Sequence, residues 1–248
     1  MTENSIASIL TGKLNTDSKI TKSFSRKSQA SSTASFKRES KRESKQGWRS
    51  HGSHCLTYAL DTKLTAPVKV AAFDLDDTLI TTKSGYKFGR GSFDWKFKFD
   101  VPRVFTKLQA EDYTIVIFSN QAAVVNAPDS KSLKILTTKI DDIFKHLEKP
   151  VIYYASTRKS KKDKSQHDLD LYTLFRKPNT GMFSQFLQDY QLTEEMLDRD
   201  NSFFVGDAAG RPGDFSDSDL KFAENLKLQF YSPEEYLPSM KHVTNEYG

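Results

Sequence analysis

The chain has 248 residues, of which 37% are hydrophobic and 28% charged, enough for one domain with a polar tail or for two small domains. A single cysteine, Cys55, excludes a disulfide framework and a cysteine-rich zinc site. No apolar run approaches the roughly 18 residues of a membrane helix, and the first ten residues lack the pattern of a secretory signal. The sequence therefore predicts a soluble protein of a reducing compartment.

The net charge of +5 belongs to the N-terminal part of the chain. Residues 1–66 hold 12 Lys and Arg against 5 Asp and Glu, whereas residues 67–248 hold 25 against 27. Seventeen of the first 50 residues are Ser or Thr, so too little apolar surface is present to offset the entropy of ordering them. We therefore expect residues 1–66 to form a disordered basic tail, residues 67–240 the folded domain and residues 241–248 a C-terminal tail.

Three hypotheses describe this basic tail. Clustered Lys and Arg, as in the repeat KRESKRES at residues 37–44, are typical of a nuclear-import or nucleic-acid-tethering arm. The alternatives are a solvated spacer and a Ser-rich transit peptide. His51, His54 and Cys55 are three potential metal ligands without a distant partner pair, so we expect no metal site there.

From residue 68 onward, short apolar runs alternate with amphipathic segments. The runs at 68–73, 113–118, 150–155 and 202–205 predict buried strands. Helices are predicted over 102–111, 132–147 and 181–190, the second from its apolar stripe of helical period. This alternation predicts an α/β fold in which a Rossmann-like parallel sheet carries helices on both faces.

Polar side chains follow three of these four strands. Asp74 and Asp76 follow the first, Ser119 and Asn120 end the second, and Asp207 follows the fourth. Ligands of open α/β sheets bind outside the carboxyl ends of the strands, so we expect these groups to meet there. Clustered carboxylates repel one another unless a cation lies among them, and Mg²⁺ suits such hard oxygen ligands.

The first of these strand ends, FDLDDTL at residues 73–79, resembles the DxDxT signature of haloacid-dehalogenase-type phosphatases. Further segments resemble the polynucleotide 3′-phosphatases, both the phosphatase half of polynucleotide kinase 3′-phosphatase and its stand-alone fungal relatives. These segments are TKSG at 82–85, DW at 94–95, VIFSNQ at 116–121, RKPNTGM at 176–182 and FVGDAAGRP at 204–212. The resemblance covers residues 68–237 and implies a haloacid-dehalogenase-like fold with a small β-hairpin flap and no large cap domain.

Two segments depart from the family pattern. Asp77 stands where many members have Gly, and residues 122–125 read AAVV where a Gly-rich loop is common. No P-loop motif is present, so we expect no 5′-kinase activity.

The resemblance also implies roles for individual residues. Asp74 is the expected nucleophile and Asp76 the general acid and base, while Thr78, Ser119 and Lys177 complete the catalytic set. Mg²⁺ is expected between the Asp74 carboxylate, the Asp76 backbone carbonyl and Asp207. The expected substrate contacts are Ser119, Asn120, Lys177, Arg176, Arg211 and Trp95.

Three segments outside this set bear on the substrate. The aromatic and basic residues between Thr82 and Phe99 suit an unstacked strand end, and they also suit a flap packed on the domain. The loop at residues 158–164 has five cations that could grip phosphates, or it is merely solvated. Asp214 and Asp219 are interpreted as helix caps rather than as groups near the metal.

Together these features predict a monomeric, nuclear, magnesium-dependent phosphatase that removes 3′-phosphates from DNA ends during repair. One alternative is an inactive phosphatase-like module that binds DNA ends. The other is a phosphatase of the same fold acting on a protein or a small metabolite, which would usually need a cap domain to exclude water.

Overall fold

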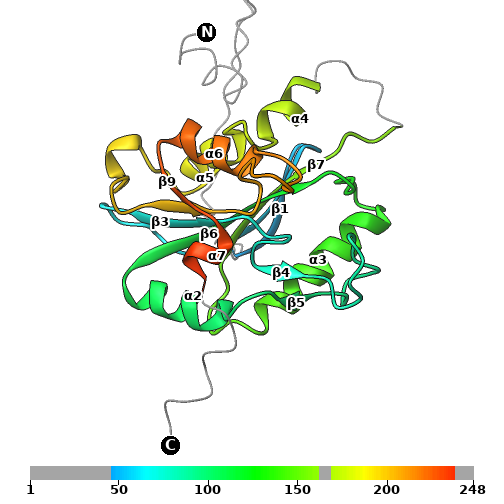
Figure 1. The fold of residues 1–248 in the computed structure, drawn as a ribbon. Helices are drawn as coiled ribbons and strands as arrows, with labels where there is room; N and C mark the ends of the chain where they lie inside the picture. The colour runs from blue at the N-terminus through cyan, green and yellow to red at the C-terminus, as the bar shows by residue number, and fades with distance from the viewer. Residues whose placement is uncertain (1–45, 162–168, 238–248) are drawn as a thin grey trace, which may run out of the picture. The chain divides into compact units, whose positions relative to one another are not determined.

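A seven-stranded sheet runs through the part of the chain that the computed structural model describes, residues 46–161 and 169–237 (Figure 1). Its order is β1-β2-β7-β6-β3-β8-β9, and all neighbours from β7 to β9 are parallel. The strands are β1 (Gly47–His51), β2 (Cys55–Ala59), β3 (Lys69–Phe73), β6 (Tyr113–Gln121), β7 (Ile152–Thr157), β8 (Phe203–Val205) and β9 (Gln229–Tyr231). The predicted α/β fold with a largely parallel sheet is therefore confirmed.

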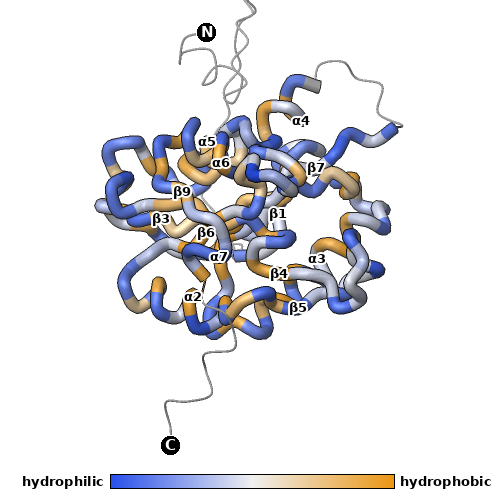
Figure 2. Tube along the Cα trace, in the orientation of Figure 1, coloured by the Kyte–Doolittle hydropathy of each residue, from blue (hydrophilic) through white to orange (hydrophobic). Residues whose placement is uncertain are grey.

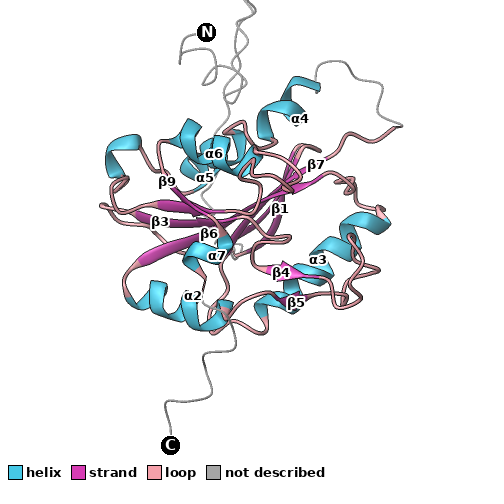
Figure 3. Cartoon of the chain, in the orientation of Figure 1, coloured by secondary structure: helices cyan, strands magenta, loops and turns pink. Residues whose placement is uncertain are grey.

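Helices cover both faces of the sheet (Figure 3). Figure 3 shows α2 (Val101–Ala110) and α3 (Lys131–Phe144) on one face. On the other face lie α4 (Leu169–Phe175), α5 (Gly181–Asp189) and α6 (Ser218–Leu226). Two short helices, η1 (Glu194–Met196) and α7 (Pro233–Tyr236), complete the described helices. No helix among the described residues has the length and apolarity to span a membrane.

Apolar side chains of the sheet strands and of the helices form the core. Figure 2 marks hydrophobic positions of the chain in orange along its trace. Residues 70–73 of β3 and 116–118 of β6 are almost completely buried, as expected of parallel strands with helices on both faces. Ser130 is the N-cap of α3, and its hydroxyl accepts a hydrogen bond from the Leu133 backbone N–H. The helix buries Leu136 and Ile140. This packing fixes the strand ends that carry the polar groups.

Residues 46–66 differ from the prediction of a disordered tail. β1 and β2 form an antiparallel hairpin, and β2 pairs with β7 in the central sheet. Cys55, Leu56 and Ala59 are buried, so the hairpin adds apolar contacts that a tail would lack. His51, His54 and Cys55 lie at the turn of this hairpin, where Cys55 packs as a buried apolar residue. Residues 1–45 and 238–248 lie outside the described residues.

A second hairpin joins β3 to α2. It pairs β4 (Ile80–Thr81) with β5 (Lys96–Phe97), and the loop between the two strands spans residues 82–95. This is the small flap that the family resemblance implied. We refer to residues 80–97 as the flap.

Candidate active site

The polar strand ends meet at one edge of the sheet. β3 lies between β6 and β8, so Asp74, Ser119 and Asp207 follow or end three strands whose carboxyl ends are neighbours. The Asp74 backbone N–H donates to the carbonyl of Val205 at 2.9 Å, which fixes the two loops beside one another. The sheet order therefore assembles groups that lie more than 100 residues apart in the sequence.

Lys177 is the buried cation of this edge. Its ammonium lies 2.5 Å from Asp74 Oδ1 and 2.8 Å from Asp219 Oδ1, and its side chain is only 1% exposed. Burial alone would lower the pKa of Lys177, but Asp219 and Asp74 together raise it above its usual value. Lys177 is therefore a permanent positive charge between the two carboxylates.

The carboxamide of Asn120 fixes the backbone of Lys177. Its Nδ2 donates to the Lys177 carbonyl at 3.1 Å, and its Oδ1 accepts from the Lys177 backbone N–H at 2.9 Å. Ser156 donates to the same Oδ1 at 3.0 Å. Asn120 was expected to contact the substrate, whereas its side chain here orients the lysine.

A third carboxylate, that of Asp207, lies close to the two that contact Lys177. One oxygen each of Asp74, Asp207 and Asp219 lies within 4.8 Å of the others. Burial, opposed by Lys177, raises the pKa of Asp74 well above its usual value. Burial and the neighbouring Asp219 raise the pKa of Asp207 to about 6. Both pKa values are raised because burial and repulsion between neighbouring carboxylates disfavour the charged form of each group.

This carboxylate set fits a divalent cation. Asp219 already uses both oxygens, because Oδ1 contacts Lys177 and Oδ2 accepts from the Ala208 backbone N–H at 3.1 Å. Asp74 and Asp207 therefore provide the carboxylate oxygens that could hold Mg²⁺, in agreement with the predicted ligands. Asp219 was interpreted as a helix cap, and that interpretation is wrong, because the N-cap of α6 is Asp217.

A glycine allows Asp219 to approach the sheet. A Cβ atom on Gly206 would lie 2.5 Å from Asp219 Oδ2 and 2.6 Å from its Cβ, far closer than an ordinary contact. Only a residue without a side chain leaves room for the Asp219 carboxylate at this place. Both a helix cap and a group near the metal were considered for Asp219 from the sequence and the cap was preferred, whereas the structure places its carboxylate with those of Asp74 and Asp207.

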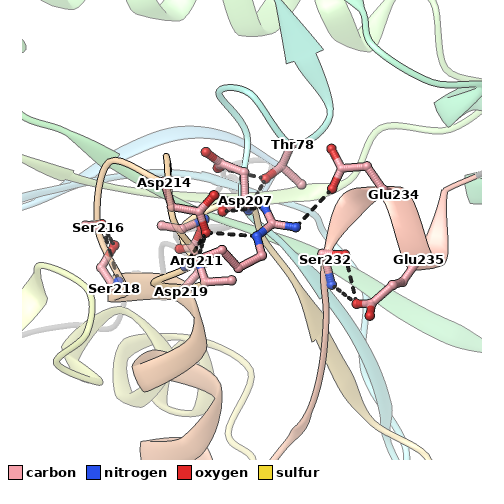
Figure 4. Close-up of polar contacts among 12 residues, drawn as sticks. Thr78, Asp207, Arg211, Asp214, Ser216, Ser218, Asp219, Ser232, Glu234 and Glu235 are labelled. Carbon is pink, nitrogen blue, oxygen red and sulfur yellow. Dashed lines mark hydrogen bonds and ion pairs between the residues drawn. The ribbon is translucent and has the colours of Figure 1, made fainter.

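Thr78 ties two of the catalytic loops together. Its hydroxyl donates to Asp207 Oδ1 at 3.2 Å and accepts from the Asp207 backbone N–H at 3.0 Å (Figure 4). The family resemblance placed Thr78 in the catalytic set, and its contacts show that it orients Asp207. The residue is completely buried.

Ser119 and Asp76 are joined by a side chain that the sequence analysis left without a role. Gln121 Nε2 donates to Ser119 Oγ and to Asp76 Oδ2, both at 2.7 Å. Lys139 contacts the other oxygen of Asp76 at 3.0 Å. The Asp76 side chain is 51% exposed, so it remains accessible to a bound molecule.

The two arginines predicted to contact the substrate, Arg176 and Arg211, are both exposed. Arg211 pairs with Asp214 at 2.9 Å and with Glu234 at 3.5 Å, and it also donates to the Asp207 carbonyl at 3.2 Å (Figure 4). Asp214 thus braces the loop after β8 and neither caps a helix nor belongs to the carboxylate set. Arg176 is exposed beside Lys177.

Trp95 does not have the exposed position expected of a substrate contact. It is only 5% exposed, its Nε1 donates to Asp142 Oδ2 of α3 at 3.1 Å, and it packs edge-on against Phe97. The indole therefore anchors the flap to the domain. The prediction of a substrate contact at Trp95 is wrong.

Other aromatic side chains of the flap are exposed instead. Tyr86, Phe88 and Phe93 are 53%, 78% and 60% exposed, and Phe215 of the loop after β8 is 82% exposed. Lys87 lies 4.7 Å from the centre of the Phe215 ring, so the flap and this loop touch. The basic loop at residues 158–164 lies partly outside the described residues, which end at 161 before this gap.

Comparison with known proteins first defines the class of this fold. The solved structure of a putative HAD-like phosphatase from Mesorhizobium loti matches with a TM-score of 0.51 at 14% identity, over 72% of this chain and 78% of that chain. The haloacid-dehalogenase-like fold is therefore confirmed.

The family model described as "Polynucleotide kinase 3 phosphatase" matches residues 69–237. The chain belongs to this family. A Schizosaccharomyces pombe relative, "Bifunctional polynucleotide phosphatase/kinase", is 41% identical over 70% of this chain. A Saccharomyces cerevisiae relative, "Polynucleotide 3'-phosphatase", is 35% identical over 68% of this chain. The chain spans 38% of the first relative and 87% of the second. The predicted resemblance and the assignment as a phosphatase enzyme are confirmed.

Proposed function

We propose that the protein is a magnesium-dependent DNA 3′-phosphatase that restores the 3′-hydroxyl at strand breaks. The observation that carries this proposal is the buried Lys177 between Asp74 and Asp219, beside Asp207. A structural sheet has no need of such a costly arrangement, whereas phosphoryl transfer needs charges placed around the phosphoryl group. The family match and the name of the Saccharomyces cerevisiae relative support the reaction.

The first chemical step would be attack of the Asp74 carboxylate on phosphorus. A bond forms between an Asp74 oxygen and phosphorus, and the bond from phosphorus to O3′ breaks. Asp76 donates its proton to the departing O3′, which leaves as the hydroxyl of the DNA end. Lys177 and the Ser119 hydroxyl stabilise the charge on the phosphoryl oxygens. The product is an aspartyl-phosphate on Asp74.

The second step would regenerate the enzyme. Asp76, now a carboxylate, takes a proton from water as that water attacks phosphorus, and the bond to Asp74 breaks to release inorganic phosphate. Mg²⁺, held by Asp74, Asp207 and the backbone carbonyl of Asp76, would screen the repulsion between the carboxylates and the phosphate. Thr78 keeps the Asp207 carboxylate oriented for this.

The exposed aromatics support an unpaired strand end as the substrate. Tyr86, Phe88 and Phe93 of the flap and Phe215 opposite present ring surfaces on which unstacked bases could lie. Cations accompany these rings, with Arg90 3.6 Å from the centre of the Tyr86 ring. Such surfaces hold a strand through stacking and phosphate charge and do not read its sequence. Action on DNA also underlies the proposal of a nuclear location, and the monomeric state stays a prediction.

The proposal is tested by measuring release of inorganic phosphate from two oligonucleotides that differ only in which end carries the phosphate. One oligonucleotide carries a 3′-phosphate and its isomer a 5′-phosphate, each with Mg²⁺ or with EDTA. We expect metal-dependent release from the 3′ end only, lost in Asp74→Asn and kept in the matched control Asp77→Asn from the same loop. Release from both ends would refute the end specificity. Binding of the 3′-phosphorylated end without release would move the protein to the class of end-binding modules.

A further inference from the structure

Asp76 has both carboxylate oxygens held by side chains that the proposed mechanism does not use. Gln121 Nε2 donates to Oδ2 at 2.7 Å, and the Lys139 ammonium lies 3.0 Å from Oδ1. Gln121 ends β6 and Lys139 belongs to α3, so two separate elements converge on one carboxylate. A half-exposed Asp on a loop would otherwise sample several rotamers.

Gln121 links the proton donor to the phosphate-binding hydroxyl. The same Nε2 that contacts Asp76 also contacts Ser119 Oγ at 2.7 Å, and Gln121 is 9% exposed. A primary amide nitrogen has two hydrogens, so it can serve both acceptors at once. The distance between Asp76 and Ser119 is therefore set by one buried amide.

Lys139 supplies a positive charge on the remaining side of Asp76. Its side chain is only 17% exposed, and its helix is anchored by the buried neighbours Leu136, Ile140 and Ile143. When Asp76 gives up its proton, a negative charge forms on the carboxylate that Lys139 contacts. A preplaced cation stabilises charge that develops during a reaction without reorganising.

We propose that Gln121 and Lys139 are positioning residues that hold the Asp76 carboxylate for proton transfer to and from the substrate. The inference rests on the proposed function, since it assigns Asp76 the role of proton donor to the leaving oxygen. Gln121 sets the place of the carboxylate relative to Ser119. Lys139 fixes its second oxygen and stabilises the charge left after proton donation.

The test compares two leaving groups. The 3′-oxygen of an oligonucleotide leaves only with a proton, whereas the phenolate of p-nitrophenyl phosphate leaves without one. For Lys139→Met and Gln121→Leu we expect kcat on the 3′-phosphorylated oligonucleotide to fall by about 100-fold, the effect typical of a misplaced catalytic group. For Lys139→Met, KM should stay within about threefold and release of p-nitrophenolate in the first turnover should stay close to the wild-type rate, because Lys139 contacts Asp76 and not Ser119. Gln121→Leu also releases Ser119, so p-nitrophenolate release should fall in that variant, but by less than activity on the oligonucleotide.

Two further variants keep this test interpretable. Lys139→Arg retains the charge and should recover most of the lost kcat, whereas Lys134→Met removes an exposed lysine from the same helix and should behave as wild type. A thermal melt of each variant separates loss of folding from loss of positioning. If Lys139→Met folds and loses both activities equally, or loses neither, the inference is overturned. A wild-type enzyme that hydrolyses the aryl phosphate and not the oligonucleotide would refute the proposed substrate instead.

Discussion

Substitution of Gly206 by Ala tests how closely the Asp219 carboxylate must approach the sheet. The new Cβ would lie 2.5 Å from Asp219 Oδ2, whereas ordinary contacts begin at 3.4 Å. Asp219 must therefore move by about 1 Å, because the clash involves its own Cβ and Cγ as well as the far end of the side chain. Its distance of 2.8 Å to Lys177 Nζ would then open to about 3.8 Å, beyond hydrogen-bond range.

The energetic consequence has two parts. Overpacking costs about 1–3 kcal/mol, and the lost charge-assisted hydrogen bond adds about 1.5–3 kcal/mol. Because relaxation relieves part of the clash, we expect the free energy of unfolding of Gly206→Ala to fall by about 2–4 kcal/mol in urea titrations. The rate of phosphate release from a 3′-phosphorylated oligonucleotide should fall by about 100-fold, since Lys177 loses its fixed position.

A double-mutant cycle decides whether Asp219 carries the effect. In Asp219→Asn the shape of the side chain is kept but the charged contact with Lys177 is already weakened. Adding Gly206→Ala there should still lower the free energy of unfolding, because the clash remains, but it should add little further loss of activity. Equal losses of activity in both backgrounds would refute the reasoning, as would an unchanged free energy of unfolding.

Three other substitutions probe single features of the structure. Lys177→Met leaves the Asp74 and Asp219 carboxylates buried without their cation, so the free energy of unfolding should fall by about 3–5 kcal/mol at neutral pH. This loss should shrink as the pH falls, because the folded variant takes up a proton on Asp74; a urea series in EDTA that shows a constant loss would contradict this. Asp77 has a φ of 62°, so Asp77→Gly should stay within about 1 kcal/mol of the wild type, whereas Asp77→Val should cost about 1–2 kcal/mol more. Hydrogen bonds from Ser84 and from the Arg90 backbone lower the pKa of Asp94 from 3.8 to about 2, so its stabilising effect is complete above pH 3.8 and disappears as the pH falls through 2. The difference in thermal stability between wild type and Asp94→Asn should accordingly vanish at the acid end, and a difference that grows there would exclude this role.

The parallel part of the sheet could be predicted from the sequence because its strands are buried on both faces. Residues 69–73 and 113–118 are nearly continuous apolar runs, a pattern typical of parallel strands that are buried on both faces. The hairpin of β1 and β2 gave a weaker signal, because each strand has only five residues and neither alternates regularly between polar and apolar side chains. The Ser-rich segment before the hairpin is polar, and the hairpin itself carries polar residues too. Composition alone therefore extended the predicted disordered tail to residue 66, past the hairpin.

Within the site, the residues at strand ends could be predicted from the sequence, but the residues that position their side chains could not. Asp74 and Asp207 follow strands directly, so topology alone brings them together. Asp219, Gln121 and Lys139 contribute through side-chain contacts that depend on how helices pack on the sheet. Trp95 illustrates the opposite error, since an aromatic residue in a basic flap suggests stacking but here fills the core.

The place of β2 in the sheet has a practical consequence for the limits of a recombinant domain. β7 is buried along its whole length and pairs with β2 on one side and β6 on the other. A fragment beginning at Pro67 would leave the backbone N–H and C=O groups of β7 unpaired along that edge. Exposed apolar edges of this kind pair with other chains, so such a fragment should self-associate. A fragment that begins before Gly47 retains the hairpin and with it a protected sheet.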